Sequence, residues 1–125
     1  MQNKWLLLSF GGVIGTIARY LLGAWVPAFA GSGFPYGTLT INLSACLLLG
    51  ILDSLSVLRG SLSPEARLLL MTGFCGAYST FSTWILETSN LISDGQMLRA
   101  SVNFFGSAAA GLVLFRLGAW LGAAI

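Results

Sequence analysis

Apolar residues fill four long stretches of the chain, and short segments rich in glycine, serine and proline separate them. The stretches run over residues 5–26, 37–58, 65–92 and 98–125. Each exceeds the roughly 20 residues that an α-helix needs to cross the hydrocarbon core of a bilayer. None shows the strict alternation of a barrel strand. The pattern therefore predicts an all-α membrane protein in which residues 1–125 form a single domain of four transmembrane helices.

Proline and polar residues mark the expected ends of these helices. Pro27 is predicted to end the first helix, because its ring removes an amide donor and clashes with the preceding turn. Before the third helix, Ser63, Pro64 and Glu65 follow one another in the order of an N-cap, a first-turn proline and a first-turn acid. The connections, residues 28–35, 59–64 and 93–97, are therefore expected to be short.

The first apolar stretch has one other interpretation, a secretory signal peptide. Ala28, Phe29 and Ala30 imitate a cleavage site of the A-x-A kind. Arg19, however, interrupts what would be the apolar core. We therefore expect the segment to be a membrane span that is retained.

Composition supports the membrane class and excludes others. The chain is 56% hydrophobic and 8% charged, whereas a soluble domain is about 25% charged. Its net charge is only +2 and its six basic residues are scattered, so no nucleic-acid surface is expected. Histidine, the commonest general base and metal ligand, is absent. Cys46 and Cys75 fall inside apolar stretches, where buried free thiols are expected rather than a disulfide.

The basic residues specify the orientation in the membrane only weakly. With both termini on one side, they divide four to two between Lys4, Arg59, Arg67 and Arg116 on or nearer that side, and Arg19 and Arg99 on the other. So small a bias permits insertion in both orientations.

The first helix carries Gly11, Gly15, Arg19 and Gly23 at four-residue spacing, which places them on one face. The glycines indicate a stripe for close helix packing. Arg19 lies within snorkelling reach of the end of the helix. It either anchors the helix at the interface or serves an anion-attracting vestibule, where pairing with Glu87 is an option.

Polar pairs at the same spacing occur in the second and fourth helices: Thr38 with Asn42, and Asn103 with Ser107. A polar side chain inside the bilayer is costly, so it suggests a functional site. The amide of Asn42 has two N–H donors that a bare anion could use. Hydrogen bonds between helices also explain both pairs.

The third helix holds the densest group of small and polar residues. Residues 73–84 contain two glycines and four serine or threonine side chains: Gly73, Gly76, Ser79, Thr80, Ser82 and Thr83. These residues weaken a helix, so we expect a break near its middle rather than a simple kink. Non-helical backbone at this depth is allowed only where it lines a cavity or is buried in protein. Carbonyls freed at such breaks bind cations in other membrane proteins.

Taken in order, these motifs resemble the small fluoride channels of the Fluc (CrcB-type) family along almost the whole chain. The matching stretches are residues 11–15 with Arg19 and Tyr20, residues 37–39 with Asn42, and residues 73–76 and 79–83 with Glu87. The resemblance implies an antiparallel, dual-topology homodimer in the plasma membrane, with two fluoride pores and a structural sodium ion at its centre.

Individual roles follow from the same resemblance. Gly76 and Ser79 match the positions whose backbone carbonyls bind sodium, and Arg19 and Glu87 belong to the vestibule. The expected fluoride pathway comprises Thr38, Asn42, Phe81, Ser82, Thr83, Trp84, Asn103 and Ser107. Two of these depart from the family pattern, because Trp84 replaces a phenylalanine and Asn103 stands where some members have tyrosine.

Such a pathway suits fluoride, whose main barrier is the loss of its hydration shell. A pore must replace that water with many weak donors and avoid trapping the ion. The Asn42 amide and the hydroxyls of Ser82, Thr83 and Ser107 can donate. Aromatic rings are electropositive at their edges, and a buried sodium ion would add fixed positive charge.

Two other functions stay open on the sequence. A small proton-coupled exporter needs a titratable carboxylate, typically in the first helix, but that helix has Arg19 and no acid. Asp53 and Glu87 lie nearer the ends of their segments. A non-transporting membrane subunit would use its polar residues only for assembly. An enzyme is not expected, because there is no nucleophile–base pair.

Overall fold

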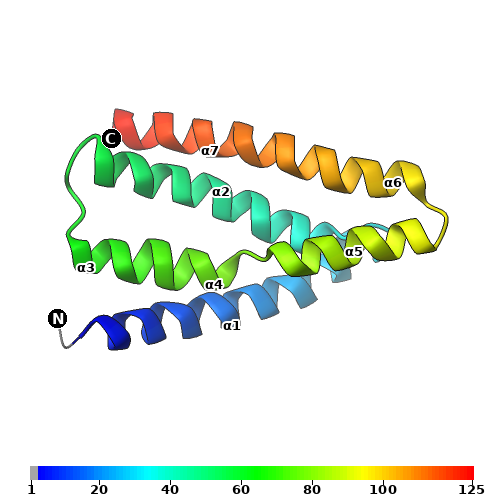
Figure 1. The fold of residues 1–125 in the computed structure, drawn as a ribbon, viewed down its shortest axis with the longest axis horizontal. Helices are drawn as coiled ribbons and strands as arrows, with labels where there is room; N and C mark the ends of the chain where they lie inside the picture. Colours follow the sequence, from blue (N-terminus) through cyan, green and yellow to red (C-terminus); the bar gives the residue numbers. More distant parts are fainter. Residues whose placement is uncertain (1–2) are drawn as a thin grey trace.

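Four helical rods lie side by side in the computed structural model, which describes residues 3–125, and both ends of the chain lie at the same end of the bundle (Figure 1). The first rod is α1 (Lys4–Ala30) and the second is α2 (Tyr36–Val57). The third rod is composite: α3 (Pro64–Arg67), η1 (Leu68–Cys75), α4 (Gly76–Tyr78) and α5 (Phe81–Ser93). The fourth rod comprises α6 (Met97–Ser101), η2 (Val102–Gly106) and α7 (Ser107–Ala124).

Three of the rods are long and apolar enough to cross a membrane: Lys4–Ala30, Tyr36–Val57 and Met97–Ala124. The third rod is interrupted after Tyr78, so neither of its halves has that length alone. An all-α fold of four helices, with the third broken near its middle, was predicted and is confirmed.

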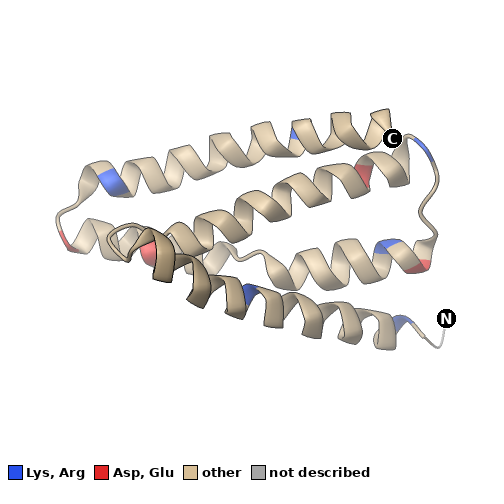
Figure 2. Cartoon of the chain, turned by 180° about the vertical axis from the view of Figure 1, so that it is seen from behind, with Lys and Arg blue, Asp and Glu red and all other residues tan. Residues whose placement is uncertain are grey.

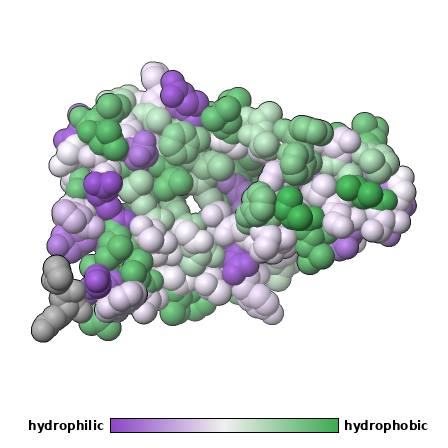
Figure 3. All heavy atoms as spheres, in the orientation of Figure 1, coloured by the Kyte–Doolittle hydropathy of each residue, from purple (hydrophilic) through white to green (hydrophobic). Residues whose placement is uncertain are grey.

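The surface has the character expected of a chain solvated by lipid. Charged residues lie mainly toward the ends of the rods (Figure 2), and apolar side chains cover much of the face seen in Figure 3. Many large apolar side chains along the rods are exposed, among them Phe10, Trp25, Leu112 and Trp120. The buried core is correspondingly small and centres on Ile41, Ala45 and Tyr78.

The prediction that Pro27 ends the first helix is wrong. Helix α1 continues through it to Ala30, and Gly31, with φ +86°, then ends the helix by donating its N–H to the Pro27 carbonyl at 2.9 Å. A proline removes the hydrogen bond to the residue four before it, here Gly23. Gly23 has no side chain, and the closely packed Gly37 lies beside its carbonyl. Gly37 of α2 thus packs against the carbonyl that Pro27 leaves without its helical donor.

The predicted start of the third rod is confirmed. Ser63 has extended backbone angles, and its hydroxyl accepts a hydrogen bond from the N–H of Ala66 at 3.1 Å. Pro64 occupies the first turn and Glu65 is its acid. The two π-helical segments η1 and η2 were not predicted.

Glycines set the closest helix contacts. A Cβ on Gly50 or Gly118 would overlap the backbone carbonyl of Phe115 or Leu47 across the contact between α2 and α7. Gly11 and Gly15 play the same part where α1 meets η1 and α4, so the predicted packing stripe is confirmed for these two residues. Lipid offers little hydrophobic drive for helix association, so close backbone contact is what holds such rods together.

Candidate functional site

The interruption of the third rod consists of two residues, Ser79 and Thr80, which we call the helix break. Both have extended backbone angles, with φ −77° and ψ 158° at Ser79 and φ −146° and ψ 115° at Thr80. Thr80 is also the N-cap of α5: its hydroxyl accepts from the N–H of Thr83 at 3.3 Å and donates to the Thr83 hydroxyl at 3.1 Å. The chain therefore leaves one helix and starts the next within two residues.

Asn42 of α2 fixes the helix break through two hydrogen bonds to one residue. Its side-chain oxygen accepts from the N–H of Thr80 at 2.8 Å, and its Nδ2 donates to the Thr80 carbonyl at 3.1 Å. Both backbone groups of Thr80 thus find the partners that a helix would otherwise have supplied. The interhelical hydrogen bond considered for Asn42 is confirmed. One Nδ2 hydrogen remains after these bonds, because the amide has two.

The same hydrogen bonds leave two carbonyl groups of the break without their helical donors. In an α-helix the Gly76 carbonyl would accept from Thr80 and the Ser79 carbonyl from Thr83. The Thr80 N–H instead donates to Asn42, and the Thr83 N–H donates to the Thr80 hydroxyl. These are the two residues whose carbonyls the sequence proposed as sodium ligands. Carbonyl oxygens freed at broken helices are a donor set that fits this ion.

Two further polar contacts hold the segment before the break. The Nε of Arg19 donates to the carbonyl of Ala77 at 3.1 Å, and the hydroxyls of Ser44 and Tyr78 share a hydrogen bond of 2.8 Å. Arg19 and Glu87 form no ion pair within residues 3–125; Oε1 of Glu87 instead accepts from the hydroxyl of Thr38 at 2.7 Å. Helices α1 and α2 therefore both contact the broken rod through polar groups.

A cavity of about 420 Å³, which we call the break cavity, opens beside the helix break. It brings together four of the predicted pathway residues from three different rods: Asn42, Phe81, Trp84 and Ser107. The hydroxyl oxygen of Ser107 is buried and has no hydrogen-bond partner in the described part of the chain. An unsatisfied buried hydroxyl on the wall of a cavity is available to a polar ligand.

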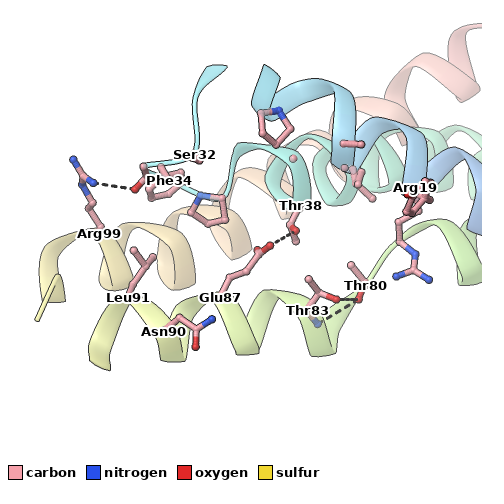
Figure 4. Close-up of a pocket in the computed structure, with 18 of the residues that line it drawn as sticks. Arg19, Ser32, Phe34, Thr38, Thr80, Thr83, Glu87, Asn90, Leu91 and Arg99 are labelled. Atoms are coloured by element: carbon pink, nitrogen blue, oxygen red, sulfur yellow. Dashed lines mark hydrogen bonds between the residues drawn. The ribbon is translucent and has the colours of Figure 1, made fainter. Parts of the chain in front are cut away.

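A second cavity, the large cavity of about 810 Å³, is lined by α1, α2, α5, α6 and the connections at that end of the bundle. It contains four further vestibule and pathway candidates: Arg19, Thr38, Thr83 and Glu87 (Figure 4). Thr80 lines both cavities. The two cavities thus share one residue of the helix break.

Trp84 of the break cavity is fixed by its neighbours. Phe81 and Trp84 meet edge to face, with ring centroids 5.6 Å apart, and Trp84 stacks on Phe104 at 5.0 Å. The Trp84 indole N–H donates to the backbone carbonyl of Asn103 at 3.0 Å. The ring edge, rather than the N–H group, is therefore what Trp84 offers to the cavity.

The structure does not bring every predicted residue to a cavity. Asn103 is buried and lines neither cavity; its Nδ2 donates to the Thr88 hydroxyl at 2.8 Å, so the helix-packing alternative describes it. Ser82 and Gly76 are exposed and also lie outside both linings. The sequence did not single out Thr80 as a site residue, although its place three residues before Thr83 is the spacing of an N-cap bond.

The family described as CrcB-like protein, Camphor Resistance (CrcB), matches residues 6–119. The chain belongs to this family. The resemblance predicted from the motifs is thereby confirmed.

Two similar proteins carry the same name. The protein "Fluoride-specific ion channel FluC" of Chlorobaculum tepidum is 49% identical over 112 residues, covering 90% of this chain and 87% of the relative. A protein of the same name from Thermus thermophilus is 43% identical over 123 residues, with 98% and 96% covered. These relatives are named as channels, in agreement with the expectation of a chain that is not an enzyme. The family and the long apolar helices make the chain a multi-pass membrane protein, consistent with the predicted place in the plasma membrane.

Proposed function

We propose that this chain forms a fluoride-selective channel that lets fluoride leave the cell passively. The observation that carries the proposal is the break cavity, where Asn42, Phe81, Trp84 and Ser107 meet beside a fixed interruption of a membrane helix. Relatives named fluoride-specific ion channels cover nearly the whole chain. Irregular backbone at membrane depth is typical of ion pathways.

The lining can replace the water that fluoride loses on entry. The second N–H of the Asn42 amide and the unpartnered hydroxyl of Ser107 are donors, and the edges of Phe81 and Trp84 add weak positive potential. None of the residues lining this cavity is basic. The ion therefore meets several weak partners and no strong one, as rapid passage requires.

We infer that the working unit is an antiparallel pair of chains with two pores. Phe81 is 72% exposed although its ring lines the break cavity, and Ser82 and Gly76 are exposed nearby. A second copy packed against this side of the broken rod would cover these residues and complete the lining. The weak charge bias between the two ends of the chain permits the opposite orientations that such a pair needs.

A sodium ion between the two copies is the second part of the proposal. Each chain would supply the carbonyl oxygens of Gly76 and Ser79, whose helical donors are diverted, and the ion would add positive charge close to the anion path. Elemental analysis of protein exchanged into potassium buffer should find one sodium ion for two chains. Sodium at background level would contradict this part of the proposal.

The function is tested by efflux from liposomes loaded with potassium fluoride or potassium chloride. We expect the purified protein to release fluoride at channel-like rates and to leave chloride inside. Fluoride release that requires an imposed proton gradient would instead support a proton-coupled exporter, for which Glu87 is the carboxylate that a membrane helix contributes to the large cavity. No release of either ion would support a non-transporting subunit.

Two substitutions test the proposed pathway. Phe81→Ile removes the aromatic edge, and Asn42→Asp removes the donors and adds a negative charge, so each should slow fluoride efflux by about tenfold or more. Phe29→Ile is the matched control, because Phe29 is 76% exposed and lines neither cavity. Parent-like efflux in both pathway variants would contradict the assignment.

A further inference from the structure

Arg99 lies at the outer end of the large cavity, away from the helix break (Figure 4). One nitrogen of its guanidinium, Nη1, donates to the carbonyl of Gly33 at 2.9 Å and to the side-chain oxygen of Gln96 at 3.0 Å. Gly33 belongs to the connection between α1 and α2, residues 31–35, whereas Gln96 directly precedes α6. A single side chain therefore joins two connections that are far apart in the sequence.

Apart from backbone hydrogen bonds at its two ends, the α1–α2 connection has little else to hold it at Gly33. Residues 31–35 carry no charge, and Gly31, Ser32 and Gly33 are exposed. Two glycines in five residues also give the connection much conformational freedom. The hydrogen bond from Arg99 to Gly33 thus fixes the wall that the connection contributes to the cavity mouth.

The charges that line the large cavity balance only when Arg99 is counted. The charged lining residues are two basic and two acidic: Arg19, Arg99, Glu87 and Asp94. They come from α1, α6, α5 and the connection after α5. Removal of Arg99 would leave two acidic residues against one basic residue, so the lining would be less favourable for an anion.

The two hydrogen bonds of Arg99 do not exhaust its donors. A guanidinium has five N–H groups, and Nη1 supplies two of them. The Nε and Nη2 groups remain, and so does the full charge. Arg99 can therefore hold the connection and face an entering ion at the same time, which a lysine cannot do in the same geometry.

We propose that Arg99 controls anion entry, by fastening the α1–α2 connection to the start of α6 and by supplying the outermost positive charge of the large cavity. The inference rests on the proposed fluoride conduction and assigns a role to a residue outside the predicted pathway. It predicts two separable effects, one electrostatic and one structural.

The electrostatic effect is tested by initial fluoride efflux from vesicles of neutral lipid. At low ionic strength Arg99→Gln should reduce the rate roughly threefold to tenfold. The reduction should shrink in about 1 M inert salt, where the screening length falls to about 3 Å. The double variant Arg99→Gln/Asp94→Asn should recover most of the salt-dependent loss of efflux rate. The cavity lining would then again carry equal numbers of basic and acidic residues, Arg19 and Glu87. Arg59→Gln is the matched control, since Arg59 is exposed in the connection between α2 and α3 at the other end of the bundle.

The structural effect is tested without transport, by hydrogen exchange of the backbone amides of residues 31–35. Exchange should be faster in Arg99→Gln and also in Arg99→Lys, which keeps the charge, and unchanged in Arg59→Gln. A conducting parent whose Arg99→Gln variant matches it in efflux at both salt concentrations and in exchange would overturn this inference alone. A parent that releases no fluoride would overturn the proposed function and, with it, the entry role of Arg99.

Discussion

Two contacts of α2 show two different ways in which this chain holds its helices together. Against α7, α2 packs through glycines at positions 50, 118 and 122, with backbones so close that a Cβ would overlap a carbonyl or a neighbouring Cβ. We call this contact the glycine interface. Against the broken rod, α2 uses polar side chains: Asn42 bonds the backbone of Thr80, and Ser44 bonds Tyr78.

The difference separates assembly from function. The glycine interface provides close packing and no hydrogen bonds to irregular backbone. Substitution of its glycines should therefore reduce stability before it affects conduction. The contacts at the helix break satisfy backbone groups that would otherwise be unpaired in the membrane, and they border two cavities. Substitutions at the helix break should therefore reduce conduction by more than their loss of stability can explain.

The largest effect is expected from Gly118→Ala in the glycine interface. The added Cβ would overlap the carbonyl oxygen of Leu47, a backbone atom that cannot turn away. Overpacking of this kind costs about 1–3 kcal/mol, so the unfolding midpoint in detergent should fall clearly. Gly12→Ala is the control, because nothing lies within 4 Å of a Cβ at that position. Equal midpoints for the two variants would contradict the description of the interface.

A smaller loss of stability, with a larger loss of conduction, is expected from Thr80→Val. The change removes the hydroxyl that caps α5, and loss of an N-cap costs about 1 kcal/mol. Ser63→Ala removes a cap of the same kind at α3 on the exposed end of the bundle. The two variants should unfold similarly, but only Thr80→Val should slow fluoride efflux. If both variants conduct like the parent, the break does not govern passage.

The smallest effect is expected from Tyr78→Phe, which keeps the buried ring and removes only its hydroxyl. The lost hydrogen bond to Ser44 should cost about 1 kcal/mol of stability and leave efflux near the parent value. A double-mutant cycle with Ser44→Ala isolates the pair. Independent effects of the two substitutions would show that the bond contributes nothing.

The rods and the break could be predicted because their causes are local. Apolar length predicts a span, Ser63 and Pro64 specify a helix start, and glycines with hydroxyls weaken the third rod. The prediction for Pro27 was wrong. The rule that a proline ends a helix considers one helix alone, whereas Gly23 packs against Gly37 of the next rod. The local rule failed where two rods pack together.

The partners of the polar side chains could not be predicted, because they depend on how the rods are placed. Asn42 reaches Thr80 across 38 positions of sequence and Arg19 reaches Ala77 across 58. Spacing within one helix shows which side chains share a face but not which rod that face meets. The polar spacing pointed to Asn42 and the family resemblance supplied Phe81, yet neither revealed the hydrogen bond of Thr80 to Asn42 or the burial of Asn103.

The helix break also has a consequence for the synthesis of the chain. Helix α5 has 13 residues, too few to cross a bilayer alone, and Thr80 would enter the lipid with unpaired backbone groups. Asn42 precedes it in the sequence, so α2 has already left the ribosome when Thr80 emerges. Membrane insertion of the third rod should therefore depend on α2 being already in place beside it. A chain that lacks α2 should fail when the third rod inserts rather than when the fourth does.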